Sequence, residues 1–527
     1  MVRRFALGCA ALLLAVPAPA RAQAAPRRAT PTLVVHLTID QMRADYLERF
    51  FPQLTGGLGR LMRGGAWFTD AYQDHAMTET APGHATVLSG RNPNSTGIVR
   101  NSEGVTDDTP RGALLEQLVP GASPWRFRGT ALFDWMHARW STARALSVSR
   151  KDRGAILPIG RAKQNVYWYQ GGEFTTSHYY RDSLPAWVRS FDVALARALG
   201  PGRRWDLLLD PGAYPEPDSE AYEHQGRDYV FPHVLPDDSA TLATAIIATP
   251  WMDSLTLAFA LEGLRQLRLG TGAHPDLLAI SLSATDYIGH PYGPDSREIH
   301  DQVLRLDRWL GMFLDSLARL RDTSRVIISL TADHGVTSYP EWWNLHGDIT
   351  AQTVSFAGLV RADSIALAAR AGPGRWIRYL DLGMLVMDRA GLARHGVDVD
   401  SVVRAIADEV RSYPQVLRVD TPRSLAARDT ATDAIARRWR NAVPADLPAE
   451  LFITLRPHMS WDGGYAEHGQ PSDDDTHVPL ILYGPPYRPG TYSGRVSVAD
   501  IAPTIARVLG IRPGERVQGR VLREALR

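Results

Sequence analysis

The chain has 527 residues, of which 44% are apolar and 22% charged, and its formal net charge is +1. This length allows a large hydrophobic core, and the composition is ordinary for a globular protein. The near-zero charge argues against binding to nucleic acid or to a membrane surface through a strong field.

The first 22 residues have the pattern of a secretory signal. A basic start is followed by the apolar run Phe5–Val16, which is too short to span a bilayer, and by an A-x-A pattern at 20–22. We expect cleavage before Gln23 and a secreted or periplasmic protein without stable membrane association; an uncleaved anchor is the alternative. Cys9 is the only cysteine, so the mature chain would hold metals with histidine and carboxylate ligands.

Short apolar runs separated by amphipathic helical patterns predict an α/β fold. The runs read as strands buried on both faces, as in a parallel sheet; they are Thr32–Ile39, Leu277–Leu282, Arg325–Leu330 and Val478–Tyr483. The clearest helical pattern covers Ser296–Leu320. We therefore expect a three-layer αβα sandwich with a mostly parallel central sheet.

Two long segments fit this alternation poorly, at about 150–245 and 360–455. We interpret both as cap insertions into a single domain of residues 23–527, covering the sheet edge and shaping a pocket. The stretch 498–511 predicts a closing helix.

Three of the predicted strands lead into aspartates. Asp40 ends the first run, Asp286 follows the second by four residues, and Asp333 follows the third. Ligand sites in open α/β sheets lie at the carboxyl ends of strands, so these acids can converge. A single aspartate in such a place is usually a cap or loop residue.

Histidines accompany these acids. His290 stands four residues after Asp286, on the same helical face, and His334 adjoins Asp333. His477 precedes the last predicted strand. With Asp40 these residues make two three-ligand sets, each leaving an open position, as in catalytic rather than structural zinc sites.

Thr80 precedes Ala81-Pro82-Gly83 and a helical pattern. Proline is tolerated at the start of a helix, so we place Thr80 at a helix amino terminus, where free amides favour an anion. By itself, the pattern is equally typical of an ordinary N-cap.

Together these motifs resemble the alkaline phosphatase superfamily, and within it the secreted PafA-type alkaline phosphatases. The matching stretches are TAPGH from Thr80, GIVRN ending at Asn101, DYIGH, ADHG and DTHVP, in that order. The resemblance implies two zinc ions: the first bound by Asp286, His290 and His477, the second by Asp40, Asp333, His334 and the Thr80 oxygen. Thr80 is then the nucleophile and forms a covalent phosphothreonine.

A basic pair bears on the type of substrate. Only two of the 58 basic residues are lysines, Lys151 and Lys163. Lys151 and Arg153 match the Lys-x-Arg pair of the PafA-type enzymes, and Asn101 matches the asparagine that donates to a phosphate oxygen. Extra cations favour a monoester dianion over a diester. We therefore expect a hydrolase of small phosphate monoesters, with no nucleic-acid partner.

Other functions remain as alternatives. A phosphodiesterase or nucleotide pyrophosphatase of the same fold would place Lys151 and Arg153 away from Thr80, and a non-catalytic metal-binding surface protein would lack a ligand or nucleophile. A threonine at position 80 disfavours a sulfatase, and the signal disfavours a cytosolic mutase. We expect His84 to be a packing histidine or to lie beside the ligands rather than among them. For His468 we expect a place beside the ligands, with a surface loop as the alternative.

Overall fold

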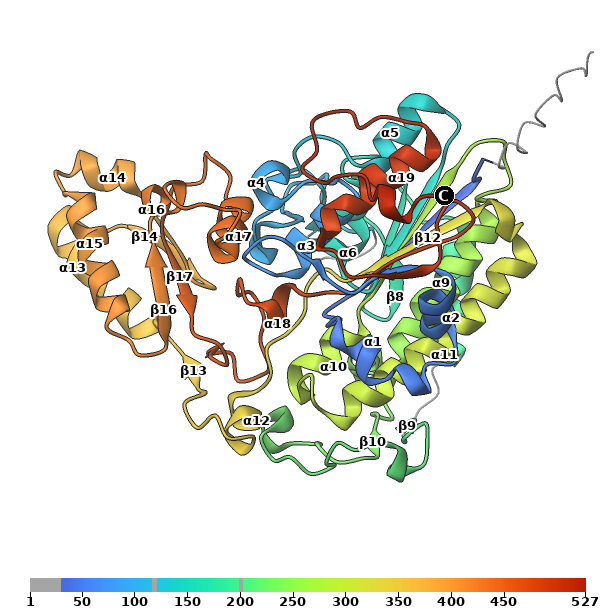
Figure 1. The fold of residues 1–527 in the computed structure, drawn as a ribbon, viewed down its shortest axis with the longest axis horizontal. Helices are drawn as coiled ribbons and strands as arrows, with labels where there is room; N and C mark the ends of the chain where they lie inside the picture. Colours follow the sequence, from blue (N-terminus) through green and yellow to red (C-terminus); the bar gives the residue numbers. More distant parts are fainter. Residues whose placement is uncertain (1–29, 116–120, 199–201) are drawn as a thin grey trace, which may run out of the picture.

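The computed structural model describes residues 30–115, 121–198 and 202–527 (Figure 1). The predicted signal, with Cys9, lies outside these residues. Among the described helices, none is by itself both long and apolar enough to cross a membrane; one sharply bent pair, Ser239–Ala248 with Trp251–Gln266, meets the test by length and composition only.

A nine-stranded mixed sheet forms the centre of the molecule. In spatial order its strands are β20 (Gly490–Tyr492), β2 (Ala66–Phe68), β19 (Leu480–Tyr483), β12 (Val326–Thr331), β1 (Leu33–Ile39), β11 (Asp276–Leu282), β6 (Ala145–Ser149), β7 (Asn165–Gln170) and β8 (Glu173–Thr175). The central strands β12, β1, β11, β6 and β7 run parallel. Every residue of β1, β11 and β12 is buried, which explains their unbroken apolar sequences.

Helices cover both faces of this sheet, which confirms the three-layer α/β prediction. Figure 1 shows one group beside the lower right face, comprising α2 (Gly57–Gly64), α9 (Trp251–Gln266), α10 (Ala284–Tyr292) and α11 (Arg297–Leu320). On the other face lie α3 (Thr80–Val87), α5 (Leu132–Arg139), α6 (Asp152–Ile156) and α19 (Ile501–Leu509). Helix α11 begins after Ser296, whose hydroxyl accepts the Ile299 amide as an N-cap.

Two features differ from the expected sheet. Strand β19 pairs antiparallel with both β12 and β2, because an apolar run buried on both faces does not encode strand direction. Strands β7 and β8, within the first expected insertion, extend the edge of the main sheet. The remainder of that insertion includes α7 (Ala186–Ala198), α8 (Ser239–Ala245) and the short pair β9 (Arg204–Trp205) and β10 (His233–Val234).

The second expected insertion forms a lobe on the left of Figure 1. Its antiparallel sheet consists of β14 (Ile377–Asp381), β15 (Met384–Met387), β17 (Ala449–Leu455) and β16 (Val416–Asp420). Helices α13 (Ala357–Ala371), α14 (Arg389–Arg394) and α15 (Val399–Arg411) accompany this sheet, and the lobe has its own hydrophobic cluster.

A second cluster joins the lobe to the main body. Trp439 of α17 (Ala434–Ala442) and Phe452 of β17 pack together with Ala76, Met77 and Val99. These three residues come from the segments that lead into Thr80 and Asn101, so the lobe packs directly behind two expected site residues.

Candidate metal centre and nucleophile

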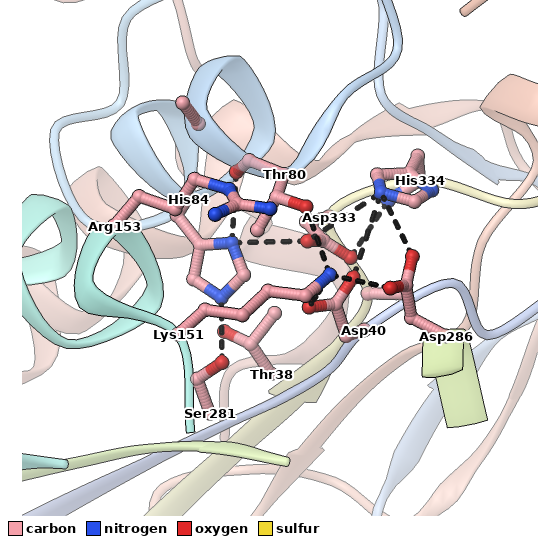
Figure 2. A network of polar contacts seen from close by, with 12 residues as sticks. Thr38, Asp40, Thr80, His84, Lys151, Arg153, Ser281, Asp286, Asp333 and His334 are labelled. Carbon is pink, nitrogen blue, oxygen red and sulfur yellow. Dashed lines mark hydrogen bonds and ion pairs between the residues drawn. The ribbon is translucent and has the colours of Figure 1, made fainter. Parts of the chain in front are cut away.

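Three buried aspartates converge at one edge of the central sheet. Because β1 is aligned with β11 and β12, these parallel strands end together. Asp40 directly follows β1, Asp286 lies in the first turn of α10 after β11, and Asp333 lies two residues after β12. The carboxylates share this space with the imidazole of His334, as Figure 2 shows.

The His334 ring faces all three carboxylates. Its Nε2 lies 3.5 Å from Asp40 Oδ1, 3.7 Å from Asp333 Oδ2 and 4.0 Å from Asp286 Oδ1. Ligand atoms fall into two groups, each with all members within 4.8 Å of one another: Asp40, Asp333 and His334, and Asp286, His334 and His468. His290 adjoins the second group, with Nε2 3.5 Å from Asp286 Oδ1.

Backbone carbonyls orient the three rings. The Nδ1 of each ring meets a carbonyl oxygen: His334 that of Gly335 at 2.9 Å, His290 that of Ala466 at 2.7 Å and His468 that of Thr78 at 2.6 Å. A carbonyl only accepts, so Nδ1 carries the proton and Nε2 is free to bind a metal. Burial lowers the pKa of both His334 and His468, favouring the neutral, metal-binding form.

Several buried atoms in the centre have charged neighbours but no hydrogen bond of good geometry from the described residues. They are both carboxylate oxygens of Asp40, Oδ2 of Asp333 and Nε2 of His334. Buried polar atoms are nearly always satisfied. Carboxylate and imidazole ligands in this arrangement suit a divalent cation such as zinc, so the residues present fit a metal centre.

Opposite pKa shifts reveal crowded negative charge. Burial and the nearby Asp286 and Asp333 raise the pKa of Asp40 well above its ordinary value. Burial also opposes ionisation of Asp286, but Lys151 and His290 outweigh it and hold the pKa of that carboxyl well below its ordinary value. The described cations therefore neutralise the cluster only in part, and an added cation would be favoured.

The structure places the His477 ring outside both ligand groups. Its Nε2 contacts the Thr69 carbonyl at 2.8 Å, and its ring stacks on Tyr72 with centroids 4.8 Å apart. The residue lies at the correct edge of the sheet, just before β19, but its backbone pairs with Tyr72 and turns the ring away. His468, which we expected beside the ligands, instead lies in a ligand group where His477 was expected, and stacks on His334 with centroids 3.8 Å apart.

Thr80 is the first residue of α3, after Glu79 in the N-cap position. Its side chain is buried, and its Oγ1 lies 3.1 Å from Lys151 Nζ. In Figure 2 the hydroxyl points toward the aspartates. A threonine hydroxyl held at a helix amino terminus beside a cation is suited to meet an anionic substrate.

Lys151 joins the nucleophile to both carboxylate groups. It follows β6, and its Nζ lies 2.7 Å from Asp40 Oδ2 and 2.6 Å from Asp286 Oδ2. Burial works against its charge, but the two carboxylates outweigh burial and raise the pKa of Lys151 above its usual value. The two carboxylates therefore favour the protonated ammonium form of Lys151.

Asn101 and Arg153 flank the nucleophile. Asn101 Oδ1 accepts the Ala81 amide at 2.8 Å, which turns its amide NH₂ away from α3 and leaves it able to donate. Arg153 reaches toward Thr80 from α6 in Figure 2, and its Nε has no partner among the described residues.

The structure also assigns contacts that sequence reasoning missed. Gln41 donates from its backbone to Asp333 Oδ1 at 3.1 Å and from Nε2 to Asp286 Oδ1 at 3.3 Å, with φ at +61°. Gln41 follows a strand-end aspartate, but only its left-handed conformation, unusual outside glycine, lets it bridge two strand ends. His84 Nδ1 lies 3.0 Å from Asp333 Oδ2 and 2.9 Å from the Thr80 carbonyl, beside the ligands as expected.

Comparisons with known proteins place the chain among characterised relatives. The family model described as type I phosphodiesterase / nucleotide pyrophosphatase matches residues 34–442. Alkaline phosphatase PhoK of Sphingomonas sp is 30% identical over 521 residues, 93% of this chain and 91% of that protein. Alkaline phosphatase PafA of Elizabethkingia meningoseptica is 28% identical, with 94% of each chain covered.

The solved structures agree. The crystal structure of wild-type alkaline phosphatase PafA superimposes with a TM-score of 0.86 at 26% identity, covering 96% of this chain and 100% of that one. Fold, aligned length and the family match therefore lead to one conclusion: this chain belongs to the type I phosphodiesterase / nucleotide pyrophosphatase family, alongside the PafA-type alkaline phosphatases.

Proposed function

We propose that this protein is an exported alkaline phosphatase, a phosphate monoester hydrolase that uses two zinc ions and Thr80 as its nucleophile. One observation carries the proposal: the Thr80 hydroxyl lies beside Lys151, whose ammonium contacts an aspartate from each of the two ligand groups. The names of the full-length relatives favour the same activity.

The donor groups suggest how the two ions would be held. Asp286, His290 and His468 would hold the first, with His468 replacing the expected His477. Asp40, Asp333 and His334 would hold the second, together with the Thr80 oxygen. When bound, the zinc ions would supply positive charge that lowers the pKa of the Thr80 hydroxyl and stabilises the departing oxygen.

The residues around Thr80 would hold the phosphoryl group. Lys151, Arg153, the Asn101 amide and the free Thr80 N–H can donate to its non-bridging oxygens. Thr80 Oγ1, after losing its proton to solvent, would bond to phosphorus as the ester P–O bond breaks, and the leaving oxygen would keep the bonding electrons and take a proton from solvent. Water would then attack phosphorus and break the P–Oγ1 bond, releasing inorganic phosphate, and Oγ1 would regain a proton.

A phosphodiesterase is the alternative, and the description of the family model keeps it open. A monoester dianion carries more charge at its non-bridging oxygens than a diester and gains more from two extra cations. The position of Lys151, 3.1 Å from the nucleophile, favours the monoester.

The test compares an aryl phosphate monoester with the matching diester on the zinc-loaded mature protein. Lys151→Ala/Arg153→Ala should lower monoester kcat/KM by about a hundredfold or more and change diester turnover little. Arg161→Ala/Lys163→Ala removes the same charges from two exposed side chains in the neighbouring loop and should leave both activities unchanged. Diester preference that is indifferent to the first double variant would identify a phosphodiesterase.

A further inference from the structure

Two segments distant in sequence meet directly behind the metal centre. One is Thr78, two residues before the nucleophile, and the other is the loop 468–470. Thr78 is completely buried and makes three contacts to that loop. Its carbonyl accepts from His468 Nδ1 at 2.6 Å, its hydroxyl accepts the Gly469 amide at 3.0 Å, and the hydroxyl donates to the Gln470 carbonyl at 3.1 Å.

These contacts bear on the orientation of His468. The Thr78 carbonyl is the hydrogen-bond partner that the described structure gives its ring. Its other neighbours are the stacked His334, the tilted His290 ring with centroids 5.1 Å apart and, at 3.9 Å, Asp286. Rotation of the ring about its stack is therefore limited mainly by Thr78. The two hydroxyl contacts fix the loop backbone on either side of Gly469.

Both segments contain a residue with a positive φ angle. Met77 has φ of +56°, a left-handed value that costs free energy for a non-glycine residue. Gly469 has φ of +110°, and a side chain there would collide with Leu382 of the lobe. The Ala76 amide is further held by the Arg438 carbonyl at 2.9 Å. Neither segment can shift freely to compensate for lost contacts at Thr78.

We propose that Thr78 is a positioning residue that couples the third histidine of the metal centre to the nucleophile. It sets the orientation of His468 and ties the 468–470 loop to the backbone that leads into Thr80. This inference rests on the proposed function, because it assumes that His468 binds zinc. Removing a group that is hydrogen-bonded to the other ring nitrogen of a metal-binding histidine typically weakens metal affinity 10- to 100-fold.

The test measures zinc affinity of the full mature chain by competition with a chromophoric chelator. Thr78→Val keeps the shape of the side chain but removes the hydroxyl contacts to Gly469 and Gln470. We expect one of two zinc ions to bind at least about tenfold more weakly. Thr78→Ser keeps the hydroxyl and should bind zinc as the wild type does.

Thr504→Val is the matched control. Thr504 is also completely buried, and its hydroxyl accepts the Leu522 amide at 2.9 Å, joining two segments away from the metal centre. Its loss leaves an amide without that acceptor, as at Gly469, so the two valine variants should lose similar thermal stability in excess chelator. Only Thr78→Val should lose zinc affinity.

The outcomes separate the inference from the proposed function. Equal zinc affinity in Thr78→Val and Thr504→Val, or a loss in Thr78→Ser as large as in Thr78→Val, overturns the inference and leaves the phosphatase in place. A wild-type protein that binds no zinc and turns over no monoester overturns both. If Thr78→Val does not fold, hydrogen exchange on the wild type decides: zinc should protect 76–79 and 468–470 together, and protection of only one segment refutes the coupling.

Discussion

Asp40 and Asp301 are both completely buried carboxylates, but their surroundings are opposite. Asp301, on α11, accepts four donors: the Leu208 amide at 2.6 Å, Tyr214 Oη at 2.7 Å, Trp205 Nε1 at 2.7 Å and Arg305 Nε at 2.5 Å. Asp40 accepts no hydrogen bond by geometry and has only ion-pair contacts, with Lys151 and His334.

The difference separates structural from metal-binding carboxylates. Where hydrogen bonds satisfy both oxygens, a buried charge joins chain segments and needs nothing more. Where they do not, ionising the carboxylate costs free energy that a bound cation would offset. This contrast predicts which buried acid is needed for metal binding and which for stability.

The largest expected effect is on activity. Asp40→Asn should lower monoester kcat/KM by at least about a thousandfold, because it removes a ligand charge. Its free energy of unfolding in excess chelator should be unchanged or slightly higher than that of the wild type. Asp301→Asn should do the reverse: kcat/KM of the folded protein stays near wild type, and the free energy of unfolding falls by about 2–3 kcal/mol. Matching losses in both variants would contradict the distinction.

The two loop histidines sharpen the same comparison. His468→Ala should lower kcat/KM by at least about a hundredfold and weaken zinc binding. His477→Ala removes a ring stacked on Tyr72. It should lower kcat/KM by less than about threefold and the free energy of unfolding by about 1 kcal/mol. Zinc content after dialysis, with kcat/KM, checks this. A variant at position 477 that loses zinc would restore the original assignment.

Removal of zinc should affect stability through Asp40 but not through Asp301. A ligand present at a thousandfold excess over its Kd stabilises the folded state by roughly 4 kcal/mol per site. Chelation should therefore lower the Tm of the wild type and of Asp301→Asn by several degrees, with recovery on adding zinc. Asp40→Asn should show a clearly smaller shift, and an equal shift would mean that Asp40 is not a ligand.

The central strands and the strand-end acids could be predicted because their signals are local. An apolar run buried on both faces identifies β1, and its direction follows once it pairs parallel with β11 and β12. The histidine ligand could not be chosen in this way, since His468 and His477 both lie near the same edge. The His468 ring is oriented by Thr78, and the His477 ring is oriented by Tyr72. Both are tertiary contacts, which a local sequence pattern does not contain.

The lobe shows the same limit. Its existence could be anticipated from the interrupted alternation, but its contact with Arg100 could not. Arg100 NH1 lies 2.7 Å from Asp381 Oδ2, and its guanidinium stacks over Tyr379. Both partners lie on β14, so the residue next to Asn101 is fixed by a segment about 280 positions away in the chain.

Asp253 gives an intermediate case, whose effect is expected only as a dependence of stability on pH. It accepts the Ala284 amide and Gln302 Nε2, each at 2.9 Å, yet burial raises the pKa of Asp253 to about 7. Since the folded protein favours the protonated carboxyl, the contribution of this residue to stability falls as pH rises from about 4 to about 7. The loss is on the order of 4 kcal/mol.

Urea unfolding in excess chelator at several pH values between 4 and 8 tests this dependence. Asp253→Asn cannot titrate at this position. The difference between its free energy of unfolding and that of the wild type should therefore shift in favour of the variant as pH rises to about 7, and stay constant above pH 7. Asp301→Asn removes a carboxylate that accepts four hydrogen bonds and should lower the free energy of unfolding instead. Parallel pH curves for the wild type and Asp253→Asn would mean that two hydrogen bonds suffice to keep a buried aspartate ionised. The contrast with Asp40 would then rest on its contacts being ion pairs, with Lys151 and His334, in place of well-formed hydrogen bonds.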